Sequence, residues 1–180
     1  MPMEKWDRCA FAASEDALEG RVCYGGLDLS STTDITAFVL VFPPLDEEDK
    51  YTVLPYFWIP EDNIDLRVRR DHVPYDVWER QGYLQTTEGN VVHYGYIEKF
   101  IERLGERFNI REIAFDRWGA VQMVQNLEGM GFTVVPFGQG FKDMSPPTKE
   151  LMKLVLEQRI AHGGHPVLRW MMDNIFIRTD

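Results

Sequence analysis

The pattern of hydrophobic and polar residues divides the chain into a strand-rich first third and a remainder in which strands alternate with helices. Three short runs rich in β-branched and aromatic residues predict strands at 22–29, 35–42 and 51–59. Thr33-Asp34 is typical of a tight turn, and Pro43-Pro44 ends the second run. Because short turns join these strands, we expect an antiparallel meander.

Helical spacing dominates after residue 60. The segment 94–107 carries apolar side chains at positions 97, 100, 101 and 104, which form one stripe on a helix. We place a further helix at 147–160, with Pro146-Pro147 suited to its first turn. The remaining predicted helices are 61–70, 75–81, 121–130 and 167–172, and the remaining predicted strands are 111–115, 133–137 and 175–177. This order predicts an α/β fold: a mixed sheet with three antiparallel strands, then parallel βαβ units, and helices on both faces.

Two acidic residues occur where strands are otherwise apolar. Asp28 lies in the first strand, although aspartate is depleted in strands. It either directs a carboxylate toward a hard cation or forms hydrogen bonds within the turn at 30–33. Asp116 ends the strand 111–115, at the edge of the sheet where ligands bind in α/β folds. It could equally cap the helix that follows.

Considered together, Asp28 and Asp116 are more informative than either alone. If their strands are neighbours, the two backbones lie about 5 Å apart. Two carboxylates at that spacing repel each other unless a cation lies between them. Mg²⁺ or Mn²⁺ prefers such oxygen ligands together with phosphate groups, and a pair of these ions can hydrolyse a phosphodiester. Asp34 is explained as a turn residue or as an acid that orients a ligand of the metal.

Composition narrows the class of protein. With 180 residues, 44% of them hydrophobic, the chain fits one globular domain, and no apolar run approaches the roughly 20 residues of a membrane span. Cys9 and Cys23 have no partners at zinc-site spacing, so free thiols are expected. His162 and His165 are expected to belong to a polar loop, and most arginines to solvated faces. The net charge of −10 argues against a protein that binds DNA over its whole surface by neutralising phosphates. It does not argue against a protein that binds metal ions through carboxylates.

Several segments together carry a resemblance to a known family. Gly25-Gly26-Leu27-Asp28-Leu29-Ser30 and its continuation to residue 37 resemble the first active-site strand of phage terminase large subunits, in their C-terminal nuclease domain. Further stretches are similar to the same family in the same order: 73–78, 113–118, 135–141, 145–151 and 162–170.

The resemblance implies a ribonuclease H-like endonuclease that cuts concatemeric double-stranded viral DNA during packaging. It implies Asp28 and Asp116 as metal ligands for Mg²⁺ or Mn²⁺, with Asp34 as a supporting catalytic acid, and a third carboxylate in a helix beyond Asp180. It also implies an ATPase domain, a small terminase subunit and a portal protein as partners, in the host cytoplasm. The chain has no phosphate-loop motif, so we expect residues 1–20 to be a connector from an ATPase domain and residues 21–180 to be the nuclease domain, truncated at its C-terminus.

Two alternatives share parts of this pattern. Residues 26–33 also resemble the phosphate loop of the sugar-kinase and actin group, whose members need a second such loop. A non-catalytic docking module of the packaging motor would suit the net charge of −10. Metal-dependent DNA cleavage separates the docking module from the nuclease.

Overall fold

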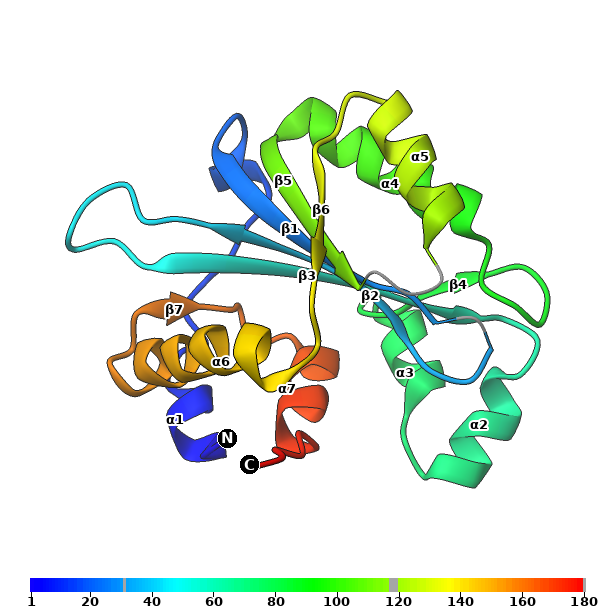
Figure 1. Ribbon diagram of the computed structural model, residues 1–180. Coiled ribbons are helices and arrows are strands. Elements are labelled where there is room, and N and C mark those ends of the chain that lie inside the picture. The colour runs from blue at the N-terminus through cyan, green and yellow to red at the C-terminus, as the bar shows by residue number, and fades with distance from the viewer. Residues whose placement is uncertain (31, 117–119, 180) are drawn as a thin grey trace.

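A twisted mixed sheet runs through the centre of the molecule, and helices lie on both of its faces (Figure 1). The computed structural model describes residues 1–30, 32–116 and 120–179. Within these residues the sheet has seven strands, in the order β4-β3-β2-β1-β5-β6, with β7 paired to β3. The predicted fold class is therefore confirmed.

The first three strands form the predicted meander. Strand β1 (Val22–Asp28) pairs antiparallel with β2 (Thr36–Phe42), which pairs antiparallel with β3 (Tyr51–Pro60). Along β2 the buried and half-buried residues alternate, because successive side chains of a strand point to opposite faces.

Parallel pairing continues the sheet beyond β1. Strand β5 (Asn109–Asp116) lies parallel to β1, and β6 (Val134–Phe137) lies parallel to β5. Helices α4 (Tyr94–Arg107) and α5 (Val121–Gly129) cross over one face between these strands (Figure 1). The prediction that strand 111–115 lies beside the first strand is confirmed.

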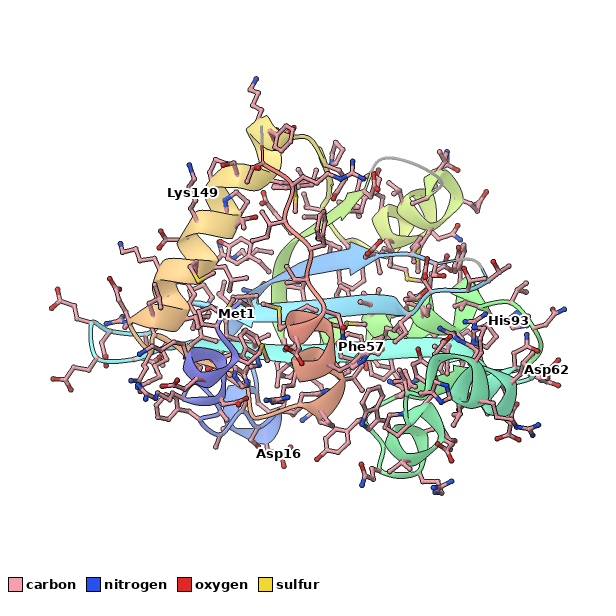
Figure 2. All side chains as sticks on the ribbon, turned by 90° about the horizontal axis from the view of Figure 1, so that it is seen from below. Met1, Asp16, Phe57, Asp62, His93 and Lys149 are labelled. Atoms are coloured by element: carbon pink, nitrogen blue, oxygen red, sulfur yellow. The ribbon has the colours of Figure 1, made fainter. Side chains whose placement is uncertain are left out.

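The side chains of β3 show how the two faces are covered. Leu54 and Trp58 belong to the main core beneath α4 and α5. On the opposite face, Val53 packs with α1 (Met3–Asp7), α6 (Phe141–Leu156) and the start of β7 (Ile160–Ala161). Phe57 packs with Val167 of α7 (Pro166–Asp173), and Figure 2 shows it beside that helix. The remaining elements are η1 (Asp16–Leu18), α2 (Ile64–Asp71), α3 (Tyr75–Arg80) and β4 (Gln85–Thr87).

Two sequence predictions need correction, and two strands were missed. The strand predicted at 175–177 is wrong, since residues 175–179 are irregular and Phe176 is exposed. The helix predicted at 147–160 begins instead at Phe141 and contains Pro146 and Pro147, because the Gly140 carbonyl already accepts the first-turn amides of residues 143 and 144. That helix ends at Leu156 rather than at residue 160, and residues 160–161 form strand β7. Neither β7 nor β4 was predicted.

Residues 1–20 pack onto the domain. Trp6 and Cys9 are buried in one apolar cluster with Val155 and Met172. None of the helices in the described part of the chain combines the length and the apolar character needed to span a membrane.

Candidate active site

Asp28 and Asp116 end two adjacent parallel strands at the same edge of the sheet. Leu27 of β1 is paired with Phe115 of β5, so the residue that follows each of them is an acid at the same level. Both carboxylates border a groove of about 450 Å³ between the sheet and α6. The structure thus brings together the two residues that the sequence singled out for metal binding.

Alternation along β1 directs Asp28 into this groove. Cys23, Gly25 and Leu27 are buried toward the main core, whereas Gly26 and Asp28 are exposed on the opposite face. The groove is therefore formed on the α6 side of the sheet, and Gly26 lines it together with Asp28.

The turn after β1 is held together without the Asp28 carboxylate. The Ser30 amide donates to Thr36 Oγ1 at 2.9 Å, the Asp34 amide donates to Ser30 Oγ at 3.0 Å, and the Tyr94 hydroxyl donates to the Ser30 carbonyl at 3.1 Å. Within the described residues the Asp28 carboxylate accepts no hydrogen bond. Turn closure, the structural explanation offered by the sequence, is therefore not its role.

Asp116 is not the N-cap residue of the helix that follows it. The N-cap position of α5 is occupied by Ala120, four residues beyond Asp116. Asp116 is half-buried, and its backbone is paired with Phe137 of β6. Arg117 of the same motif lies outside the described residues.

The electrostatic environment opposes ionisation of Asp28. Partial desolvation by the surrounding protein raises the pKa of the Asp28 carboxyl above its usual range, and the negative charges of Asp116 and Asp34 raise it further. A bound cation would counteract this rise in pKa, because it stabilises the charged carboxylate.

Asp34 lies outside the groove. It is exposed in the turn between β1 and β2 and lines a second pocket, formed with α2 and α7. Its charge still acts on Asp28, so the two acids are coupled electrostatically.

Sequence reasoning did not assign the other residues of the groove. Phe137, Met144 and Leu151 supply its apolar wall, and Gln139 and Thr148 are polar side chains on the same lining. The Thr148 hydroxyl donates to the Met144 carbonyl at 2.6 Å, which ties it to α6. Four of these five residues lie in the stretches 135–141 and 145–151, which resemble the family. The resemblance could therefore have pointed to them, but it assigned them no function.

His162 and the two cysteines have structural roles. His162 stacks on Trp6 with ring centres 4.2 Å apart, its Nε2 lies 2.8 Å from the Trp6 carbonyl, and its Nδ1 accepts from the Gly164 amide. Cys9 and Cys23 are buried free thiols, and burial raises the pKa of Cys23 to about 12. Across residues 1–30, 32–116 and 120–179, no group of three or more His, Cys, Asp or Glu side chains is arranged to hold a metal ion.

Comparison with known proteins agrees with this geometry. The large terminase subunit of Enterobacteria phage HK97 is 38% identical over 162 residues, which are 89% of this chain and 32% of that protein. Its crystal structure matches with a TM-score of 0.80 at 36% identity, covering 94% of this chain and 35% of that one. This chain therefore spans about a third of the HK97 protein.

A more distant structure shows the same fold. The large terminase nuclease of thermophilic phage G20c, solved with bound magnesium, matches with a TM-score of 0.56 at 13% identity, covering 89% of this chain and 70% of that one. The sequence model of the terminase large subunit endonuclease domain matches residues 1–180. The chain therefore belongs to the terminase large subunit endonuclease domain family.

Proposed function

We propose that this domain is a metal-dependent endonuclease that hydrolyses phosphodiester bonds of double-stranded DNA, with Asp28 and Asp116 as the ligands of Mg²⁺ or Mn²⁺. The observation that carries the proposal is the placement of these two carboxylates at the ends of adjacent parallel strands, beside one groove. Carboxylate oxygens on rigid strands are the ligands that hard cations prefer.

The donor set fits a magnesium-type site. Mg²⁺ is commonly bound by one or two carboxylates together with waters and substrate phosphates, so a cage of three protein ligands is not required. The raised pKa of Asp28 also fits, because a site built for a cation is strained without one. The nuclease of phage G20c was solved with bound magnesium, which supports the same assignment here.

In hydrolysis, a water oxygen bonds to phosphorus while the bond from phosphorus to the leaving deoxyribose oxygen breaks. The attacking water gives up one proton, and the leaving oxygen takes one up. Divalent cations at this edge would supply Lewis-acid stabilisation and a more acidic water. Asp28 and Asp116, held rigidly by their strands, would hold these cations and through them position the scissile phosphate, and the charge of Asp34 acts on Asp28.

The biological setting follows from the family. The proposed substrate is concatemeric viral DNA in the host cytoplasm, and the proposed partners are a packaging ATPase domain, a small terminase subunit and a portal protein. The division into a connector (residues 1–20) and a nuclease domain (21–180), with a third carboxylate beyond Asp180, is part of the same proposal. The family match favours this assignment over the sugar-kinase and actin group.

Plasmid cleavage in Mn²⁺ tests the proposal, with residues 1–180 and with any longer natural form of the chain. Replacing Asp28 or Asp116 by Ala should reduce the cleavage rate at least ~10²-fold, because a lost metal position removes several kcal/mol of charge stabilisation. If the longest folded form leaves supercoiled DNA intact, or if Asp116→Ala cuts as fast as the wild type, the docking-module function replaces the nuclease.

A further inference from the structure

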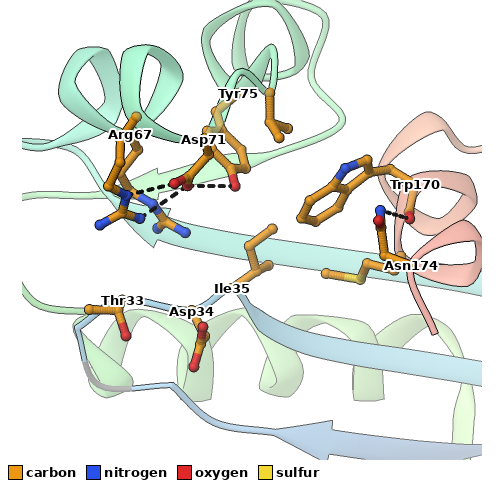
Figure 3. Close-up of a pocket in the computed structure, with 11 residues that line it drawn as sticks. Thr33, Asp34, Ile35, Arg67, Asp71, Tyr75, Trp170 and Asn174 are labelled. Atoms are coloured by element: carbon orange, nitrogen blue, oxygen red, sulfur yellow. Dashed lines mark hydrogen bonds and ion pairs between the residues drawn. The ribbon is translucent and has the colours of Figure 1, made fainter. Parts of the chain in front are cut away.

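A second pocket, of about 670 Å³, has Thr33 and Asp34 in its wall, in the turn that follows the Asp28 strand. It is formed by the turn after β1, helix α2 and helix α7. Figure 3 shows Arg67, Asp71 and Tyr75 on one side of it, Thr33 and Asp34 across from them, and Trp170 and Asn174 at a third side. Asp34 connects this pocket to Asp28, because the charge of Asp34 acts on the Asp28 carboxyl.

Arg67 is the unusual residue of this pocket. Its side chain lines the pocket, yet only 6% of the residue is exposed. Its Nε and Nη1 atoms are buried and make no hydrogen bond within the described residues, and within the same residues it forms no ion pair. The composition of α2 predicted a solvated arginine, so its burial is a finding of the structure.

The acids of the pocket compensate Arg67 only in part: the charge of Arg67 helps to lower the pKa of Asp71, but the hydrogen bonds that Asp71 accepts come from other side chains. Asp71 accepts from Arg70 Nε at 2.6 Å, from Arg70 Nη2 at 3.0 Å and from the Tyr75 hydroxyl at 3.1 Å. Asp34 is exposed in its turn. The guanidinium of Arg67 lies 4.9 Å from the centre of the Tyr75 ring, a cation–π contact that compensates only part of the cost of burial.

A buried cation with no direct ion pair and with two unpartnered N–H groups is costly to the fold, so its retention points to a ligand that supplies the missing oxygens. The planar guanidinium matches the oxygens of a phosphate group, which it can contact through two parallel hydrogen bonds. We propose that Arg67 binds a phosphate of the nucleic-acid backbone and so positions the strand that enters the Asp28 site. The choice of DNA as the source of the phosphate rests on the proposed function, whereas phosphate recognition by Arg67 does not.

The test is made without divalent cations, in EDTA, so that it is independent of the metal site. The probes are inorganic phosphate, read as a shift in Tm, and a fluorescein-labelled DNA duplex, read by anisotropy at several salt concentrations. Arg67→Met removes the buried charge, and Arg80→Met is the matched control, because Arg80 is an exposed arginine paired with Asp76 outside the pocket.

We expect Arg67→Met to weaken duplex binding about 10-fold or more and to reduce the salt dependence by roughly one phosphate contact, while Arg80→Met changes either little. The rise in Tm caused by phosphate should disappear in Arg67→Met. The Tm of this variant in EDTA should match or exceed that of the wild type, because an incompletely compensated buried charge is removed. A purely structural arginine would instead give a lower Tm and unchanged binding by the folded protein, which would overturn the inference.

The two sources of phosphate give different results. If Arg67→Met loses the response to inorganic phosphate but binds the duplex like the wild type, the site accepts a free phosphate and the assignment to the DNA backbone is wrong. Should Arg67→Met not fold, Arg67→Lys keeps the charge without the planar fork and should still show weaker duplex binding. Asp28→Asn should abolish cleavage yet keep the Arg67-dependent binding, so failure of the nuclease proposal and failure of this inference are distinguishable.

Discussion

Asp28 and Asp116 lie side by side because Leu27 and Phe115, the residues before them, are paired across parallel strands. The relationship is fixed by backbone hydrogen bonds of the sheet rather than by a flexible loop. Two acids held in this way repel each other, and the raised pKa of Asp28 records part of that repulsion.

The first prediction concerns Asp28 in the absence of metal. Because its pKa is raised in the folded state, the folded chain binds the proton more tightly than the unfolded chain, and the ionised carboxylate costs stability at neutral pH. Asp28→Asn should therefore raise the Tm in EDTA at pH 7, with a smaller gain as the pH falls toward the ordinary carboxyl range. Added Mn²⁺ should raise the Tm of the wild type but not that of the variant. Equal Mn²⁺ binding by both proteins, measured by calorimetry, would sink the metal assignment.

The second prediction concerns Asp34. It acts on Asp28 through its charge and is exposed, so Asp34→Ala should slow plasmid cleavage by roughly 10- to 100-fold, less than loss of either strand-end acid. Glu48→Ala is the control, because Glu48 is an exposed acid between β2 and β3 and lines neither pocket. A variant at Asp34 that is as inactive as Asp28→Ala would make Asp34 a direct ligand instead.

The third prediction compares two glycines of β1. A Cβ on Gly25 would lie 2.9 Å from the Phe38 ring and 3.3 Å from Ile113, so Gly25→Ala should lower the free energy of unfolding by about 1–3 kcal/mol. A Cβ on Gly26 meets nothing within 4 Å, so Gly26→Ala should be close to neutral. Urea unfolding of both variants measures the difference, and equal stabilities would contradict the close packing of β1 between β2 and β5.

The fourth prediction concerns acid stability. His165 packs against the rings of Phe57 and Tyr83, and burial lowers its pKa to about 4. The unfolded chain, with a histidine pKa near 6.5, takes up this proton first, so the stability contributed by neutral His165 is present above about pH 6.5 and is lost as the pH falls toward 4.

Thermal unfolding across this pH range should therefore show a shallower dependence for His165→Asn than for the wild type. His72→Asn is the control, since His72 is exposed and its left-handed backbone suits asparagine. Parallel curves for wild type and His165→Asn would remove His165 as the cause.

The helices and strands that could be predicted are those whose own residues show a clear hydrophobic period. The apolar stripe of 94–107 gave the bounds of α4, and the three β-rich runs gave the meander, because each run is long enough to show its period. Strands β4 and β7 were missed because two or three residues carry no period, and β7 exists through its pairing with Tyr51 and Thr52, far away in the sequence.

The same distinction applies to the residues of the candidate site: some could be identified from the sequence, and others only from the fold. An acid within an apolar strand is visible in the sequence, so Asp28 and Asp116 could be named and their adjacency expected. The burial of Arg67 could not, because α2 has the composition of a solvated helix and the covering residues come from distant segments. The groove wall depends on where α6 crosses the sheet, which no single segment encodes.

The pairing of β1 with β5 also bears on how the chain folds. We expect the hairpin contacts of the meander to form first, since they join residues close in sequence, whereas the pairing of β1 with β5 closes a loop of residues 29–115. Asp28 and Asp116 therefore meet only when that loop closes, and their repulsion opposes this step alone. A divalent cation held between them would stabilise the closed loop. Occupancy of the metal site would then slow the separation of β5 from β1.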